Sequence, residues 1–191
     1  AYDPAEISEV FVTHAHIDHT GRLPKLIKDG FKGKVYSTPP TRDFAELLLL
    51  DSEHVLRIEA ERHRHEPVYG IPDVTEVVKL WKKVPYRQKF SVGPFSIEFF
   101  DAGHILGSAF VAVEVEGKRI VFSGDLGSKN DPFIRPLEQA PAADFLVTES
   151  TYGNSVHHEI EKRKEVLEDV IEETAKRKGT LMIPAFALER T

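Results

Sequence analysis

The chain of 191 residues contains no cysteine. This absence excludes a disulfide framework and a thiolate zinc site, so histidine and carboxylate side chains would have to hold any bound metal. No apolar run approaches the roughly 20 residues that span a bilayer, and no signal segment is visible. These absences favour a cytoplasmic protein with no membrane partner.

An excess of positive charge is also missing, because the formal net charge is -6 at pH 7. Proteins that bind nucleic acid through many phosphates normally carry a basic surface, so this charge argues mildly against broad electrostatic binding. Two divalent cations in an acidic cleft would reverse the local sign of the charge. The net charge alone therefore does not exclude a polyanionic ligand, provided that the protein holds cations.

The most informative segment is His-Ala-His-Ile-Asp-His at residues 14–19, which directly follows the apolar run 10–13. Imidazole nitrogens and carboxylate oxygens are ligands that suit zinc and similar metals, and a turn after a strand can direct alternate side chains at neighbouring ions. The alternative is a solvated loop that happens to be rich in histidine. The strand followed by the cluster favours a site for two metals, with His14 and His16 at one ion and Asp18 and His19 at the other.

Further ligands are expected at the ends of other strands, because six residues cannot complete two coordination spheres. His104 follows the apolar stretch 95–100, and Asp125 follows the strand-like stretch Arg-Ile-Val-Phe at 119–122. Taken alone, His104 would be an ordinary loop histidine and Asp125 an ordinary turn residue. Together with the first cluster, both become candidate ligands, and the two oxygens of Asp125 would let it bridge two ions.

Short apolar strands alternate with amphipathic helices along the chain, which is typical of an α/β fold. We expect strands at residues 10–13, 35–37, 95–100, 109–115, 118–123, 145–148 and 180–183. Glu116 and Gly117 predict a hairpin between two of these strands. We expect helices at residues 22–29, from 41 to about 62, from 73 toward 81, and 155–178. The second helix should bury Phe44, Leu47, Leu48, Val55 and Ile58.

Five motifs together resemble the metallo-β-lactamase superfamily, and more closely its β-CASP branch of nucleic-acid-processing hydrolases, which includes proteins like the cleavage and polyadenylation specificity factor. They are His-x-His-x-Asp-His at 14–19, Ala-Gly-His-Ile-Leu-Gly-Ser at 102–108, Ser-Gly-Asp-Leu-Gly at 123–127, Thr-Glu-Ser-Thr-Tyr-Gly-Asn at 148–154 and Ile-Pro-Ala-Phe-Ala at 183–187. The first motif marks the superfamily, and the second and fourth narrow it to the β-CASP type.

The resemblance implies a metallo-β-lactamase αββα sandwich and two Zn²⁺ ions. His14, His16 and His104 would hold one zinc, Asp18 and His19 the other, and Asp125 would bridge them. Asp18 is also expected to orient the attacking water. Glu149 matches the acidic residue of the first β-CASP motif, where it would lie behind a ligand histidine or near the nucleophile. His157 matches a histidine often found after the Tyr-Gly-Asn turn in similar proteins.

By the same resemblance, the expected activity is that of a zinc-dependent ribonuclease, acting in RNA processing or decay, with a metal-activated hydroxide that attacks the RNA phosphodiester. Because a dinuclear site hydrolyses many bonds, a small-molecule metallo-hydrolase of the wider superfamily remains an alternative. A catalytically silent RNA-binding subunit of a processing complex is another.

The chain begins at Ala1, and its only methionine is Met182. We therefore expect residues 1–191 to be the central part of a metallo-β-lactamase domain, with N-terminal strands absent and the β-CASP insertion beginning just after residue 191. On that expectation the isolated piece would lack ligands and be inactive. A missing edge strand would also leave unpaired backbone groups, so a homodimer is a further expectation.

Overall fold

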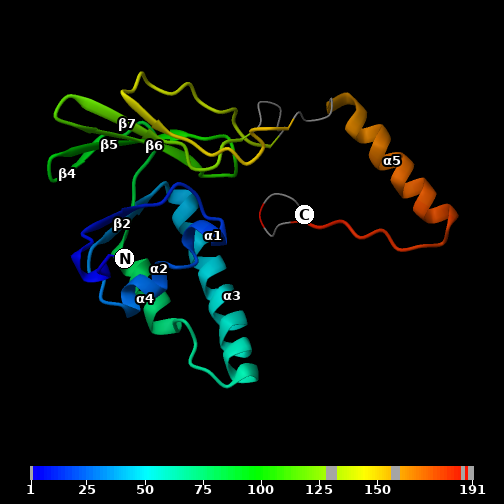
Figure 1. Ribbon diagram of the computed structural model, residues 1–191, viewed down its shortest axis with the longest axis horizontal. Coiled ribbons are helices and arrows are strands. Elements are labelled where there is room, and N and C mark those ends of the chain that lie inside the picture. The colour runs from blue at the N-terminus through cyan, green and yellow to red at the C-terminus, as the bar shows by residue number, and fades with distance from the viewer. Residues whose placement is uncertain (1, 128–132, 156–159, 186–187, 189–191) are drawn as a thin grey trace. The chain divides into compact units, whose positions relative to one another are not determined.

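The computed structural model describes residues 2–127, 133–155, 160–185 and 188. The chain divides into two compact units, Ala1–Glu149 and Ser150–Thr191. The first unit contains both β-sheets (Figure 1). All residues of the predicted metal site also belong to this unit. Among the described residues of the second unit there is one helix. The mixed α/β fold predicted from the sequence is confirmed.

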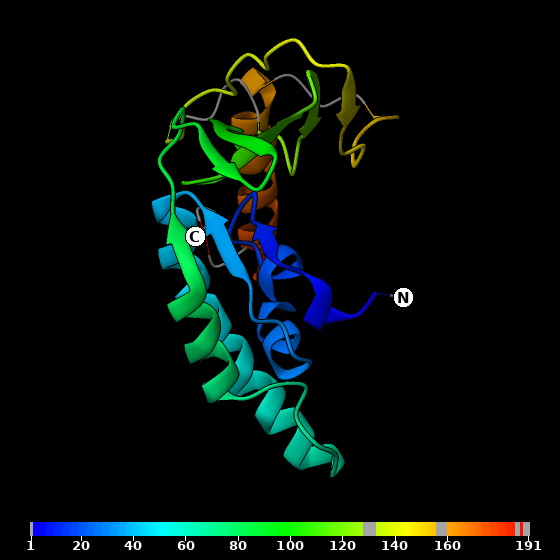
Figure 2. The same ribbon diagram turned by 90° about the vertical axis from the view of Figure 1, so that its left-hand side faces the viewer.

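The first sheet of unit one is parallel and has the strand order β1-β2-β3. Its strands are β1 (Glu9–Phe11), β2 (Lys34–Ser37) and β3 (Trp81–Lys83). A short 3₁₀ helix (Pro4–Glu6) precedes β1. The connecting helices are α1 (Ile17–Thr20), α2 (Leu23–Lys28), α3 (Pro39–His63) and α4 (Ile71–Leu80). Helix α4 packs against α2, α3 and β2, so these helices cover one face of the sheet (Figures 1 and 2).

The second sheet has the strand order β4-β5-β6-β7-β8. Its strands are β4 (Phe90–Val92), β5 (Phe95–Asp101), β6 (Ala109–Val115), β7 (Lys118–Phe122) and β8 (Phe145–Val147). Neighbouring strands are antiparallel except for β7 and β8, which are parallel. The predicted hairpin joins β6 to β7, and both of its turn residues, Glu116 and Gly117, have positive φ.

Apolar side chains fill the space between the two sheets. Phe99 is fully buried, and Phe90 packs on it with a ring separation of 6.0 Å. From the parallel sheet, Tyr36 stacks on Phe90, and the Phe11 ring is tilted against Phe90 with centroids 6.2 Å apart. The opposite face of the second sheet buries Phe100 and Phe110, with Leu126 and Leu137 packed against them. The layers of this unit are therefore helix, sheet and sheet, as in the first three layers of an αββα sandwich.

Two predictions of secondary structure around residue 81 need correction. The expected helix 73–81 begins earlier, at Ile71, and Asp73 closes its first turn by accepting the Gly70 N–H at 2.9 Å. Trp81 is the first residue of β3 rather than the end of the helix, and its indole N–H donates to the Ser37 hydroxyl at 2.8 Å. Strand pairing with β2 overrides the helical pattern there.

The predicted apolar face of the long helix α3 is wrong. Leu47 is 66% exposed and Val55 48% exposed, whereas the buried residues are Thr41, Ala45, Leu49, Glu53 and Ala60. The buried residues recur mainly at a spacing of four, which places them on one side of a helix. Thr41, Ala45 and Ala60 on that side are small, and Leu49 is its one large apolar side chain. Phe44 and Leu48 are half-buried at the edge of that side.

Unit two contains α5 (Ile160–Lys176), which lies within the helix predicted at 155–178. Ser155, the expected first residue of that helix, lies in no helix. Residues 156–159, which include His157, and residues 186–187 of the last motif lie outside the described residues. Lys178 adopts positive φ and the Gly179 N–H bonds to the Thr174 carbonyl, which ends the helical turn. The strand expected at 180–183 is wrong, because the structure assigns these residues to no strand, and Met182 is 84% exposed. In the described part of the chain, no helix is long and apolar enough to span a bilayer.

Candidate metal centre

The first site loop runs from the end of β1 into α1. The Val12 N–H still bonds to the Tyr36 carbonyl at 2.8 Å, so the extended backbone continues to the edge of the loop. His14 is fully buried there, and His16 caps the N-terminus of α1. The Thr20 hydroxyl donates to the Ala15 and His16 carbonyls, which closes the loop back on itself. This local folding holds the two histidines in fixed directions.

The second site loop joins β5 to β6 and carries His104. The Ser108 hydroxyl accepts the backbone N–H groups of His104 and Ile105, at 3.0 and 3.2 Å. The carbonyl of Gly107 accepts the hydroxyl of Thr38 at 2.5 Å and the hydroxyl of Thr41 at 2.7 Å. Hydrogen bonds from the start of α3 therefore fix the position of the loop that carries His104.

The third site loop follows β7 and carries Asp125. A Cβ atom on Gly127 would lie 1.4 Å from the carbonyl oxygen of Gly103, so the second and third loops touch through backbone that only glycine permits. The Glu149 carboxylate accepts the Leu126 N–H at 2.6 Å, and the Glu149 N–H donates to the Ser123 hydroxyl at 3.0 Å. Glu149 therefore braces the backbone on both sides of Asp125.

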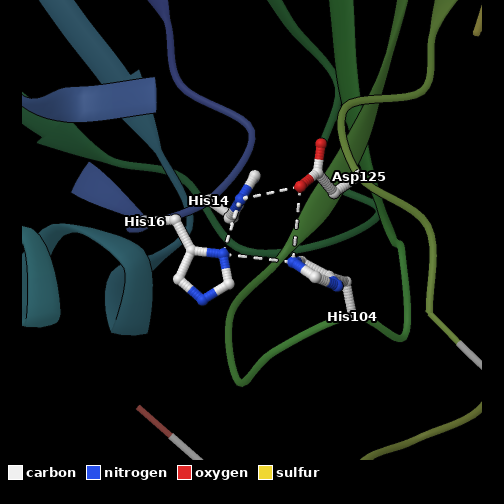
Figure 3. Close-up of side chains that lie close together, drawn as sticks. All are labelled: His14, His16, His104 and Asp125. Carbon is white, nitrogen blue, oxygen red and sulfur yellow. Dashed lines mark hydrogen bonds and ion pairs between the residues drawn. The ribbon is translucent and has the colours of Figure 1, made fainter. Parts of the chain in front are cut away.

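Four side chains from these three loops converge on one point, as Figure 3 shows. One donor atom from each of His14, His16, His104 and Asp125 lies within 4.8 Å of every other. His16 Nδ1 is 3.1 Å from His14 Nε2 and 3.2 Å from His104 Nε2. Asp125 Oδ2 is 3.7 Å from His14 Nε2 and 3.6 Å from His104 Nε2.

These spacings fit a single tetrahedral zinc ion. Four donors that each lie about 2.1 Å from one ion in tetrahedral geometry are about 3.4 Å apart. The observed separations fall on both sides of that value, between 3.1 and 3.7 Å. Three imidazole nitrogens and one carboxylate oxygen also form a donor set that suits zinc.

A second group lies on the other side of the Asp125 carboxylate. His19 Nε2 is 3.4 Å from Asp125 Oδ1 and 3.5 Å from Asp18 Oδ2. The rings of His14 and His19 have centroids 4.0 Å apart, so the two groups are adjacent. The Asp18 side chain is 76% exposed. One oxygen of Asp125 therefore faces the three-histidine group, and its other oxygen faces His19.

The electrostatics of the buried group favour neutral imidazole at His14. Burial, together with the neighbouring rings of His19, His104 and His16, lowers its pKa from 6.5 to about 2. His14 is therefore neutral at physiological pH. A neutral ring keeps the nitrogen lone pair that a metal ligand needs.

The structure thus brings together all six side chains that the sequence singled out as ligands: His14, His16, Asp18, His19, His104 and Asp125. Their assignment as ligands stays a prediction. Sequence reasoning missed the bracing roles of Ser108, Thr38 and Thr41. Ser108 acts on backbone groups within its own loop. Thr38 and Thr41 act on Gly107, which is distant in the sequence, so no local pattern signals their contacts.

Comparison with known proteins shows the family. A model described as "Metallo-beta-lactamase superfamily" matches residues 1–171. The chain belongs to the metallo-β-lactamase superfamily, as its motifs predicted.

Similar proteins within this superfamily carry names connected with RNA. The chain is 36% identical to "Ribonuclease TTHA0252" of Thermus thermophilus, over 99% of this chain and 42% of that protein. It is 32% identical to "Cleavage and polyadenylation specificity factor subunit 3" of Dictyostelium discoideum, over 98% of this chain and 24% of that protein. It is 35% identical to "Transcription termination factor FttA" of Methanosarcina mazei, over 97% of this chain and 30% of that protein. The chain thus spans less than half the length of each of these relatives.

Proposed function

We propose that the protein is a zinc-dependent ribonuclease that hydrolyses RNA phosphodiester bonds at a site for two metal ions. The observation that carries this proposal is the arrangement around Asp125. Its Oδ2 lies near His14 and His104 at 3.7 and 3.6 Å, and its Oδ1 lies near His19 at 3.4 Å. A carboxylate with a separate imidazole group at each oxygen is suited to bridging two cations.

Two cations bound there would lower the pKa of a bound water, so that hydroxide is available at neutral pH. They would also place positive charge near the phosphoryl oxygens. The protein side chains have separate tasks. His14, His16 and His104 would hold the buried ion, and His19 with Asp18 would hold the exposed one. Because its carboxylate is exposed beside His19, Asp18 is also placed to orient the attacking water toward a substrate that arrives from solvent.

Glu149 would act on this site through the backbone. It braces Asp125 by accepting the N–H of Leu126, so it is a positioning residue in this proposal. The choice of RNA as the substrate is supported by the relatives named for ribonuclease activity and for cleavage and polyadenylation. The acidic net charge of -6 agrees with a site whose attraction for phosphate comes from bound cations.

The test is metal analysis of the full-length protein together with digestion of end-labelled RNA. We expect two zinc ions per chain, and we expect His16→Ala to lose zinc and to cleave RNA about a thousandfold more slowly. His54→Ala is the matched control, because His54 is an exposed histidine of α3 whose ring nitrogen contacts Arg57. Full cleavage by His16→Ala would refute the proposal.

The same digestion separates the alternatives. Zinc binding with RNA binding but no cleavage would indicate a silent RNA-binding subunit. Zinc binding with hydrolysis of small esters and no action on RNA would indicate a small-molecule metallo-hydrolase. Either result would overturn the ribonuclease assignment and leave the metal site standing.

A further inference from the structure

Thr13 lies where the three site loops meet. It immediately precedes His14, at the point where β1 passes into the first loop. Its backbone carbonyl accepts the N–H of Ala109, the first residue of β6, at 2.7 Å. Thr13 therefore ties the first loop to the strand that follows the His104 loop.

The side chain of Thr13 is also pressed against the third loop. A Cβ atom on Gly124 would lie 2.7 Å from Thr13 Cβ and 2.9 Å from Thr13 Oγ1. Gly124 has a φ of +54°, which favours glycine there, and it precedes Asp125. This close contact restricts the rotamer of Thr13 and keeps its hydroxyl turned in one direction.

That hydroxyl faces the ring of His14. Thr13 Oγ1 lies 3.1 Å from His14 Nδ1, while Nε2 of the same ring lies 3.1 Å from His16 Nδ1 within the donor group. A neutral imidazole carries one N–H and one lone pair, and a ligand nitrogen must present the lone pair. Because His14 is fully buried, its remaining N–H needs an acceptor inside the protein.

We propose that Thr13 is the positioning residue that sets the tautomer of His14: its hydroxyl accepts the Nδ1–H and so leaves Nε2 unprotonated toward the metal. This role rests on the proposed metal site. Partners of this kind orient a ligand ring and raise its basicity, and their loss typically weakens metal binding about 10–100-fold. Gly124 contributes by giving the Thr13 side chain the space to adopt this orientation.

Two variants of the full chain test the proposal. Thr13→Val keeps the branched shape against Gly124 and removes the hydroxyl, whereas Thr13→Ser keeps the hydroxyl. Zinc affinity is measured by competition with a chromogenic chelator. The tautomer of His14 in the metal-free protein is read from long-range ¹H–¹⁵N correlation spectra, with the ring assigned from the signals lost in His14→Asn. Thermal unfolding checks that both variants remain folded.

We expect the wild type and Thr13→Ser to carry the proton on Nδ1 of His14 and to bind zinc with similar affinity. Thr13→Val should lose that tautomer preference and bind zinc about 10–100-fold more weakly. A proton on Nε2 in the wild type, or equal zinc affinities for wild type and Thr13→Val, would overturn the role of Thr13 and leave the proposed function intact. If the wild type binds no zinc, the proposed function fails, and the role of Thr13 in metal binding fails with it.

Discussion

The two donor groups on either side of Asp125 differ most in burial. In the first group the His14 side chain is 0% exposed and the His104 side chain is 18% exposed. In the second group the Asp18 side chain is 76% exposed and the His19 side chain is 31% exposed. Asp125 lies between them, with its side chain 32% exposed.

This difference follows from what holds each group. The buried histidines come from loops that are tied to one another by backbone hydrogen bonds and by glycine contacts, whereas Asp18 and His19 come from the four-residue helix α1 alone. A site whose ligands are held before binding loses less conformational entropy when the ion arrives. The buried group should therefore bind its ion more tightly, and the exposed group should face the substrate.

Among variants that test the difference between the buried and the exposed donor group, we expect the largest effect on zinc content and RNA cleavage for His19→Ala in the full-length protein. The variant should keep the buried ion and lose the exposed one, so zinc content should fall from two ions to one. RNA cleavage should fall about 100-fold or more, because water activation and charge neutralisation then depend on a single ion. Elemental analysis and an RNA cleavage assay measure the two effects. Loss of both ions would contradict the prediction that the buried group binds its ion without help from His19.

An intermediate effect is expected at Glu149, which braces Asp125 between the two groups. Glu149→Ala removes the acceptor of the Leu126 N–H and should cost about 1.5–3 kcal/mol of unfolding free energy, the usual value for a hydrogen bond to a charged group. Glu149→Gln keeps an acceptor oxygen and should lose about 1 kcal/mol or less. Urea unfolding measures both values.

RNA cleavage by the same two variants separates positioning from direct catalysis. If Glu149 only positions Asp125, Glu149→Gln should cleave RNA far better than Glu149→Ala. Equal inactivity of the two variants, with Glu149→Gln as stable as the wild type, would show that the negative charge of Glu149 takes part in the reaction.

The smallest effect is expected outside both groups, at the surface pair of Asp43 and Lys83. A hydrogen bond from Lys83 lowers the pKa of the Asp43 carboxyl below its usual 3.8. A lowered folded-state pKa means that the contribution to stability is present above about pH 4 and is lost as the pH falls through the folded-state value. Asp43 is 53% exposed, so the contribution should be at most about 0.5 kcal/mol.

Unfolding of Asp43→Asn followed between pH 7 and pH 3 measures this contribution. The difference from the wild type should be small at neutral pH and should shrink further in acid. Loss of zinc by this variant would contradict the separation of the surface pair from the metal centre.

The candidate site was predictable from the sequence because its residues are carried by compact motifs at strand ends. His14, His16, Asp18 and His19 lie in one six-residue segment, and chain topology is enough to bring strand-end loops to one edge. The mixed α/β fold was also predictable, because strand and helix patterns alternate along the sequence. Local pattern and global fold agree in these segments.

The remaining features depend on contacts that no local pattern records. Leu47 and Val55 fit a helical apolar face, yet α3 buries Thr41, Ala45 and Leu49, because its tertiary neighbours lie on that other side. Trp81 completes a helical pattern but pairs with β2 as a strand. The Thr13 hydroxyl became a candidate only once its distance to His14 Nδ1 and the closeness of Gly124 were known.

The central claim is that Asp125 joins two neighbouring metal ions, and anomalous scattering at the zinc edge from crystals of the zinc-loaded full-length protein tests it most directly. The account predicts two peaks. One should lie about 2.0–2.2 Å from His14 Nε2, His16 Nδ1 and His104 Nε2, and the other should lie at similar distances from His19 Nε2 and Asp18, with one Asp125 oxygen bound to each ion. A single peak away from Asp125, or no peak among these side chains, would contradict it.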